Sequence, residues 1–514
     1  MKKILPVTRF KTLARNDWYI AVFLFAGTAA SRLPFRVSYL FSWDSVLYTR
    51  AIQHFDVRVH QPQPPGYIFY VGLVWLVNHF LGDPNAAMIW ISVFASAAAV
   101  AAFYWLGRIM FGRQAGLVAS ILLATSLNFW GLSEVAFPYV LLTLFSTLVA
   151  ILLFKAWRGQ AGYILAAAAV LGLASGFRQD LLTFMLPLFL LVLWSKGWRR
   201  TLEALALLAF CTASWYVPSS LLTGGFAVYR HASSAETAGV FRDFSIFGKG
   251  AHALLTNARQ FEHFMLLALG GAAPFLIYFI LRLVAPGAGR FRRDRRLLFL
   301  AVWFLPPAVF YMLVHIGESG YVMSIIAPAL LAASWGFSHL AADAGRLLGS
   351  HRLSRFRNAR MQSGVRHLIY ILPALAVAAN LFLFLGTYKG LSSRKLARSD
   401  EVLQSRLRTV RADFDPRTTL IVAVYRFEQV SYYLPDYQVW HFDPVENKDP
   451  RTSIPPGIKD VVFFGSEFEL KHVSLAEALP LKGGANLVYI DTRRVQPGQH
   501  QLAVDWNRMK VSLS

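Results

Sequence analysis

The sequence predicts a mainly α-helical, polytopic membrane protein with about eleven transmembrane helices and a small α/β domain at its C-terminal end. Two observations predict this fold class. Of the 514 residues, 56% are hydrophobic and only 15% are charged, a balance typical of helices in lipid rather than of soluble domains. Apolar runs of membrane length recur as far as residue 388, and a more charged, β-rich composition follows. The predicted domains are therefore residues 1–388 and residues 389–514.

The charge and cysteine content exclude several other classes of protein. The net charge of +23 does not indicate nucleic-acid binding, because the basic residues lie in short clusters between apolar runs, as orientation signals do. Cys211 is the single cysteine, which excludes an intramolecular disulfide and a cysteine-based metal site. No cleavage signature follows the apolar run 18–31, so this run is expected to remain as the first helix.

Eleven apolar segments are expected to cross or nearly cross a bilayer. They are 18–31, 86–107, 114–132, 137–154, 161–177, 181–195, 201–222, 263–284, 297–314, 321–341 and 367–388. The run 67–82 is shorter and is interrupted by Asn78 and His79, so it is predicted to lie in the membrane interface. With the N-terminus in the cytoplasm, the inner segments hold 23 Lys and Arg residues and the outer loops hold 9. This bias agrees with the positive-inside rule, and an odd number of spans places the C-terminal domain outside.

With the N-terminus in the cytoplasm, most acidic residues of the membrane region fall on the outer side of the membrane. Those on the outer side or at its boundary are Asp44, Asp56, Glu134, Asp180, Glu236, Asp243, Glu262 and Glu318. The outer loops are therefore expected to carry most of the polar chemistry.

The C-terminal region reads as a small α/β domain of a usual size for one domain. Short β-rich runs occur at 420–425, 437–441, 460–464 and 486–491, with Pro and Gly breaks between them, as expected for strands joined by turns. Two polar and aromatic stretches, 425–428 and 432–436, could face a catalytic cavity, although a packed α/β core explains them equally well.

The first outer loop holds the most informative residues. Asp44 can cap a short amphipathic helix at roughly 45–55 that lies at the interface. A carboxylate beside a membrane also costs free energy to desolvate, so it can indicate a functional site. The Pro-rich segment 62–66 is expected to be a stiff connector.

Three other outer segments carry candidate polar residues. Glu134 lies in Ser133–Pro138, Arg178 lies in Gly172–Asp180, and His315 and Tyr321 lie in His315–Tyr321. Each residue also has a structural explanation. Glu134 could extend its side chain to the membrane interface, Arg178 could pair with Asp180 or contact a lipid headgroup, and His315 could simply end a helix.

The order of these features resembles a known class. A first helix, Asp44 with Tyr48 on the same helical face, a Pro-Pro-Gly-Tyr turn and an interfacial helix are similar to the first extracytoplasmic loop of polyprenyl-phosphate-dependent glycosyltransferases of the GT-C class. The protein O-mannosyltransferases and the bacterial lipid A aminoarabinose transferases are the most similar families, over roughly residues 15–330. The resemblance implies a GT-C-like integral protein of the bacterial inner membrane, with its active site and C-terminal domain on the periplasmic side.

The resemblance also implies roles for particular residues. Asp44 would be the catalytic base, Glu134 would orient the acceptor or help Asp44 to hold a divalent metal, and Arg178 would bind the donor phosphate. Further candidates to bind substrate are Tyr48, Arg50, His60, Tyr67, His315 and Tyr321. Two departures leave the donor sugar and any metal requirement open, because Asp44 is followed by Ser45 where relatives commonly have Asp-Glu, and Gln63 replaces a basic residue before the Pro turn.

The implied reaction transfers a sugar from a polyprenyl-phosphate donor to a lipid, protein or glycan acceptor, with inversion. One carboxylate base is sufficient because phosphate leaves readily, and no Walker P-loop occurs in the sequence, in agreement with a donor reached from the lipid. A transporter or flippase of lipid-linked sugars is the alternative, and it would place polar residues near the bilayer midplane in repeated halves. A non-catalytic glycan-assembly protein is a third possibility, and it would tolerate the loss of Asp44 and Glu134.

Overall fold

A computed structural model describes residues 15–285, 289–349, 359–423, 426–441, 455–464, 486–489 and 502–503. By their contacts these residues form two compact units, and each unit is treated by itself. The first unit contains residues 1–36 and 51–395, and the second contains residues 37–50 and 396–514. The domains predicted from the sequence, 1–388 and 389–514, place the segment 37–50 in the membrane domain. The contacts instead group this segment with the second unit.

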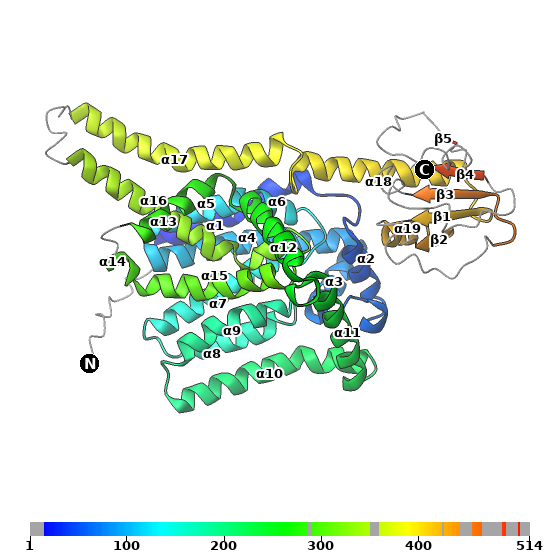
Figure 1. The fold of residues 1–514 in the computed structure, drawn as a ribbon, viewed down its shortest axis with the longest axis horizontal. Helices are drawn as coiled ribbons and strands as arrows, with labels where there is room; N and C mark the ends of the chain where they lie inside the picture. The colour runs from blue at the N-terminus through cyan, green and yellow to red at the C-terminus, as the bar shows by residue number, and fades with distance from the viewer. Residues whose placement is uncertain are drawn as a thin grey trace. The chain divides into compact units, whose positions relative to one another are not determined.

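The first unit is built from helices (Figure 1). They are α1 (Arg15–Arg32), η1 (Leu33–Phe35), η2 (Val57–Val59), α3 (Ile68–Leu81), α4 (Pro84–Phe111), α5 (Arg113–Thr125), α6 (Leu127–Leu132), α7 (Tyr139–Trp157), α8 (Tyr163–Ala174), α9 (Asp180–Leu193), α10 (Trp198–Leu222), α11 (Phe226–Phe244), α12 (Ile246–Leu269), η3 (Gly270–Ala272), α13 (Ala273–Val284), α14 (Gly289–Arg292), α15 (Arg295–Leu313), η4 (Tyr321–Ser324), α16 (Ile326–Gly349) and α17 (Ala359–Gly386).

Within the described residues, six helical segments are long and apolar enough to cross a membrane, judged by length and composition. They are Asn16–Phe35, Pro84–Phe111, Tyr139–Trp157, Trp198–Leu222, Ile246–Val284 and Arg295–Leu313. Shorter apolar helices, including α5, α8 and α9, lie between them in the chain. Each of the eleven predicted segments is helical over most of its length, so the expected helical membrane fold is confirmed.

The helix α3 is one of the shorter apolar helices. It has 14 residues, which corresponds to about 21 Å along its axis and is short of the roughly 30 Å of a hydrocarbon core. It packs mainly against α4. The helices α5, α8 and α9 are as short, so the placement of the run 67–82 in the interface stays a prediction.

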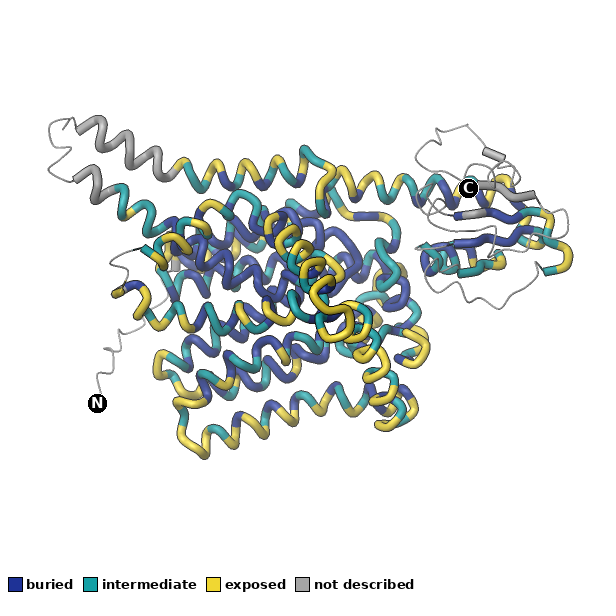
Figure 2. Tube along the Cα trace, viewed as in Figure 1, coloured by how far each residue is buried: buried dark blue, intermediate teal, exposed yellow. Residues whose placement is uncertain are grey.

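The packing centre of the first unit lies around α4, α5 and α7. Figure 2 shows long buried stretches in these central helices and exposed residues along the peripheral α10. A Cβ atom added to Gly107 of α4 would lie 2.6 Å from the Cα atom of Gly116 in α5, so these two glycines allow the helices a close approach. Asn380 of α17 is buried and accepts a hydrogen bond from the Gly271 N–H (2.8 Å), which fixes α17 against η3.

The segments predicted to face the cytoplasm meet at one end of this unit. Asp17 of α1 pairs with Arg108 of α4 (2.7 Å) and accepts a hydrogen bond from Tyr104. Arg296, at the start of α15, donates to the Met110 carbonyl oxygen (2.8 Å). We call the other end of the unit, where the predicted outer loops meet, the site end.

The second unit is a small α/β fold with a five-stranded sheet. Its elements are α2 (Trp43–Ala51), α18 (Ser393–Asp413), β1 (Thr419–Ala423), α19 (Phe427–Tyr433), β2 (Gln438–His441), β3 (Asp460–Phe464), β4 (Asn486–Tyr489) and β5 (Leu502–Ala503). The strand order is β2-β1-β3-β4-β5, with β5 antiparallel to β4 and the other pairs parallel. The apolar face of α18, with Leu403 and Val410, packs on Ile421 and Val462 of the sheet.

The predicted β-rich runs correspond to the strands of this sheet. The run 420–425 overlaps β1, which begins one residue earlier, the runs 437–441 and 460–464 contain β2 and β3, and the run 486–491 contains β4. Positions 424–425 and 490–491 of these runs lie outside the described residues. The small α/β fold that was expected near the C-terminus is therefore confirmed.

Candidate functional site

Arg178 lies at the site end, in the turn between α8 and α9. Its side chain is only 7% exposed, and its guanidinium carbon lies 4.3 Å from the ring centre of Tyr139 and 5.4 Å from that of Tyr67. Asp180 pairs with it at 3.2 Å. The predicted ion pair therefore exists, and the two tyrosine rings fix the plane of a cation that would otherwise be mobile.

The Pro-rich turn brings Tyr67 to Arg178. Phe69, the second residue of α3, donates its N–H to the Gly176 carbonyl oxygen (3.0 Å), and a Cβ atom on Gly176 would approach the Phe69 ring to 2.5 Å. On its other side the turn is held by Tyr229 of α11, whose hydroxyl donates to the Pro65 carbonyl oxygen (2.6 Å). The Pro-rich turn and the start of α3 are therefore held by two segments distant in the sequence, the turn between α8 and α9 and the helix α11.

Tyr139 joins Arg178 to the last predicted outer segment. The rings of Tyr139 and Tyr321 lie 5.8 Å apart, and a Cβ atom on Gly320 would be 2.3 Å from the Tyr139 ring. Only a glycine at position 320 lets this ring pack there. Tyr321 also contacts the ring of His315 (5.8 Å), and burial lowers the pKa of His315, which favours its neutral form at pH 7.

The structure thus brings four of the predicted site residues together in the first unit. They are Tyr67, Arg178, His315 and Tyr321. We call this set with Tyr139 the Arg178 cluster. It combines one guanidinium with hydroxyl and imidazole groups, which are the groups that bind phosphate and sugar oxygens.

Glu134 belongs to a separate buried group. Its side chain has no exposed surface, and its Oε1 accepts a hydrogen bond from the Trp130 indole N–H (2.9 Å). Arg32, at the end of α1, lies over the same indole ring at 4.5 Å and donates to the Ala124 carbonyl oxygen (2.7 Å). Burial raises the pKa of Glu134 to about 8, against the opposing influence of Arg32 and the Trp130 hydrogen bond. Its Oε2 atom has no hydrogen-bond partner among the described residues.

The divalent metal implied by the resemblance was tested against these residues. Within the described ranges, no group of three or more His, Cys, Asp or Glu side chains could hold a metal ion. The positive charge of Arg32, which acts on Glu134, further disfavours a cation there. The described residues therefore do not fit a metal at Glu134, and no reaction step is derived through one.

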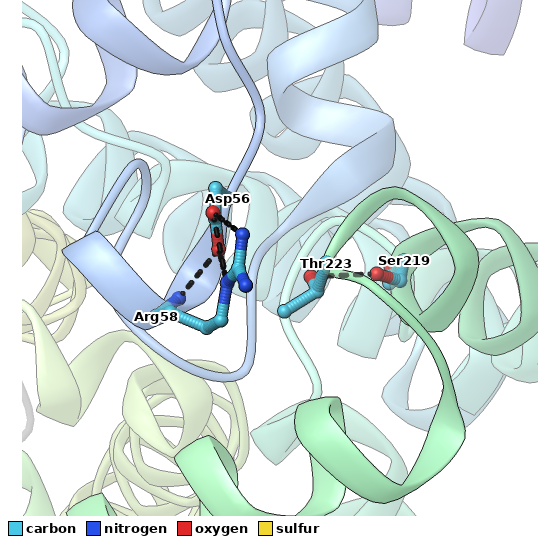
Figure 3. Close-up of polar contacts among 4 residues, drawn as sticks. All are labelled: Asp56, Arg58, Ser219 and Thr223. Carbon is cyan, nitrogen blue, oxygen red and sulfur yellow. Dashed lines mark hydrogen bonds and ion pairs between the residues drawn. The ribbon is translucent and has the colours of Figure 1, made fainter.

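His60 is not part of the Arg178 cluster. It is exposed, adopts a left-handed backbone conformation (φ 55°) and ends the short helix η2. The same loop is held by Asp56, which caps η2 and pairs with Arg58 at 2.6 Å. Figure 3 shows this pair beside the end of α10, where the Thr223 hydroxyl donates to the Ser219 carbonyl oxygen (2.8 Å). Arg58 holds the pKa of Asp56 below its usual range.

The remaining candidates, Asp44, Tyr48 and Arg50, lie on α2 in the second unit. The helix begins at Trp43 and ends at Ala51, so it starts before the predicted cap and is shorter than the predicted 45–55. Asp44 therefore lies in the first turn, where the helix dipole favours a carboxylate. Tyr48 is buried, Asp44 is half-buried, and Arg50 pairs with Glu428 at 2.6 Å.

The sequence did not single out Arg32 or Tyr139 as site residues, and it marked Glu428 only as part of the stretch 425–428. Arg32 and Glu134 are about a hundred positions apart and meet around the Trp130 ring, a relation that no spacing rule reveals. The signal that could have found Tyr139 is its position five residues after Glu134, at the start of the predicted membrane segment 137–154 that follows an outer loop.

The fold and the clustered loops define an integral membrane protein with the architecture of the GT-C class. A family model described as dolichyl-phosphate-mannose-protein mannosyltransferase matches residues 63–219. A search of curated proteins finds no match.

Solved structures support the same architecture. The chain is similar to ArnT from Cupriavidus metallidurans bound to undecaprenyl phosphate, with a TM-score of 0.55, 14% identity and 93% of each chain covered. The apo state of that protein gives a TM-score of 0.50 at 14% identity, with 92% of each chain covered. The apo oligosaccharyltransferase of Archaeoglobus fulgidus gives 0.50 at 13% identity, covering 82% of this chain and 64% of that one. The GT-C-like fold that the sequence predicted is confirmed.

Proposed function

We propose that this protein is a membrane glycosyltransferase that transfers a sugar from a polyprenyl-phosphate donor to a lipid, protein or glycan acceptor. The observation that carries the proposal is the Arg178 cluster, in which a nearly buried guanidinium is held between two tyrosine rings. The shared fold supports it, since one structure of that fold, ArnT, is bound to undecaprenyl phosphate. The family model, named for a dolichyl-phosphate-mannose enzyme, covers both Tyr67 and Arg178.

Arg178 would act on the phosphate of the donor. A guanidinium matches two phosphate oxygens with two parallel hydrogen bonds, and its charge stabilises the negative charge that grows on the phosphate as the sugar leaves. Tyr67 and Tyr139 would keep the planar group in one orientation. Because the Arg178 side chain is only 7% exposed, these interactions would be stronger than on an exposed surface.

Asp44 would act as the general base. The acceptor oxygen or nitrogen attacks the anomeric carbon, the bond from that carbon to the phosphate oxygen breaks, and the phosphate leaves with the electron pair. The acceptor proton passes to the Asp44 carboxylate. One displacement without a covalent intermediate inverts the anomeric carbon, in contrast to the two-step scheme of retaining glycosidases.

Glu134 would act at a distance from the reacting atoms. Its burial and its hydrogen bond to Trp130 favour a role in shaping the loop that leads into Tyr139. The role in acceptor orientation suggested by the resemblance stays a hypothesis.

The active site and the C-terminal domain are proposed to lie on the periplasmic side of a bacterial inner membrane. The excess of Lys and Arg in the opposite set of segments, 23 against 9, supports this orientation. The carrier lipid would then reach the Arg178 cluster from the outer leaflet.

The proposal is tested by incubating the purified full-length protein with radiolabelled polyprenyl-phosphate sugars and a membrane extract, and by identifying the labelled product. We expect one labelled acceptor class from the wild-type protein and none from Asp44→Asn, with the variant folded and expressed. Transfer at the wild-type rate by Asp44→Asn would remove Asp44 from the mechanism. Donor that crosses a liposome bilayer without a new product would instead support the flippase alternative.

A further inference from the structure

The segment before α2 is bound to the C-terminal part of the chain. The Ser38 N–H and the Tyr39 N–H both donate to the carboxylate of Asp400 in α18. The Leu40 N–H donates to the hydroxyl of Tyr433 in α19 (2.8 Å), and the rings of Tyr39 and Tyr433 lie 5.2 Å apart. Backbone N–H groups of the first loop thus find their partners in side chains of α18 and α19.

The helix α2 is then held at both of its ends by α19. At its start, Trp43 contacts the rings of Phe427 (6.0 Å) and His441 (5.2 Å). At its end, the Arg50 guanidinium pairs with Glu428 and donates to the Ser431 hydroxyl, each at 2.6 Å. A short helix fastened at both ends by a second helix has little freedom to shift or rotate.

The end contact is the stronger of the two. The Glu428 side chain is 9% exposed and that of Arg50 is 29% exposed, so the pair is shielded from most solvent screening. Ser431 donates in turn to the Glu428 carbonyl oxygen (3.1 Å), which fixes its hydroxyl close to Arg50. Removal of one partner leaves the other charge largely buried without its counter-ion, which is unfavourable.

We infer that α19 positions the proposed base, through the Glu428–Arg50 ion pair, and that Arg50 acts as a positioning residue rather than as a ligand of the substrate. This inference rests on the proposed function, because it assigns a purpose to the placement of Asp44. The carboxylate of Asp44 lies in the first turn of α2, so a displacement of the helix moves the carboxylate with it. A misplacement of about 1 Å in a reacting group can cost roughly a hundredfold in rate.

Charge reversal in the full-length protein tests the inference. We expect Arg50→Glu and Glu428→Arg to lower kcat about tenfold or more while the KM for the donor stays unchanged, and we expect the double variant to recover most of the loss. Glu401→Lys is the matched control, because its partner Arg398 lies on the same exposed face of α18 (3.7 Å, 57% and 68% exposed), and it should behave as wild type.

Two results would overturn the inference. One is wild-type turnover in both single variants. The other is a folded double variant that is no more active than either single variant, which would assign Arg50 to the substrate. If a reversal variant does not fold, the conservative pair Glu428→Gln and Ser431→Ala replaces it, and smaller losses of kcat at constant KM are expected from each.

Hydrogen exchange separates this inference from the proposed function. In the wild-type protein, slow exchange is expected for the amides of residues 38–40, and Glu428→Gln should accelerate exchange across 38–50 relative to Glu401→Lys. Equal exchange in these two variants would refute the positioning role. This readout needs no activity, so a wild-type protein that transfers no sugar would contradict the proposed function and leave the exchange result to decide the inference.

Discussion

Replacement of Arg178 by lysine tests the central feature of the proposed site. Lysine keeps the positive charge and its attraction to Asp180, but it loses the planar fork and the stacking against Tyr139 and Tyr67. Asp44→Asn tests proton transfer, whereas Arg178→Lys tests recognition of the phosphate and leaves the base in place.

The expected loss follows from the contacts of Arg178. A cation–π contact is worth about 0.5 kcal/mol or more, and a hydrogen bond to a charged group about 1.5 kcal/mol or more. Loss of one of each costs at least about 2 kcal/mol, or roughly 30-fold in kcat/KM for the donor, since about 1.4 kcal/mol corresponds to a factor of ten.

The assay measures initial rates with the labelled donor in detergent micelles, and the elution profile and unfolding midpoint are recorded as checks of folding. Arg58→Lys is the control, because Arg58 is paired with a neighbouring acid as Arg178 is, but its side chain is 54% exposed. A value of kcat/KM for Arg178→Lys close to that of wild type would refute the role of Arg178. An equal loss in Arg58→Lys would show that the effect is not specific to the Arg178 cluster.

Three further predictions concern the surroundings of the cluster. Gly320→Ala should displace the Tyr139 ring, which lies 2.3 Å from the added carbon, and should raise the KM for the donor. The control Gly27→Ala has open space around its Cβ position and should leave this KM unchanged. Equal KM values for the two variants would contradict the prediction. Tyr229→Phe removes the hydrogen bond to the Pro-rich turn and should lower stability by about 1 kcal/mol, visible as a lower unfolding midpoint. Because burial raises the pKa of Glu134 to about 8, the folded state holds its proton more tightly than the unfolded state. The stabilisation from the protonated Glu134 carboxyl is therefore complete below about pH 4.5 and declines as the pH rises towards 8. Glu134→Gln should remove this decline when unfolding midpoints are measured between pH 5 and 8.

The sequence was sufficient to predict the membrane helices. A run of apolar residues long enough to cross lipid has few alternatives to a helix, so α1, α4 and α7 follow directly from composition. The short α3 was also predictable, since Asn78 and His79 interrupt its apolar run. The prediction of polar chemistry in the outer loops led to Tyr67, Arg178, His315 and Tyr321, which the structure brings together.

The partners of these residues could not be predicted. Arg32 and Glu134 interact around an indole ring, and such a contact depends on how α1 packs beside α6 rather than on any local pattern. The placement of Ser38 and Tyr39 against Asp400 depends on backbone N–H groups, which every residue except proline carries. Contacts made by backbone groups leave no mark in the amino-acid sequence, and the assignment of 37–50 to the second unit required a structure.

The composition of the second unit from residues 37–50 and 396–514 has a consequence for biosynthesis. The ribosome releases α2 early and α19 only near the end of the chain, after every residue from 51 to 395 has been made. Throughout that interval the first loop has no α19 to pack against, and Leu40 and Tyr433 cannot form their hydrogen bond. A polypeptide that stops before residue 427 would therefore contain the apolar helices of the first unit and still lack the contacts of Trp43 and Arg50 that hold α2 in place.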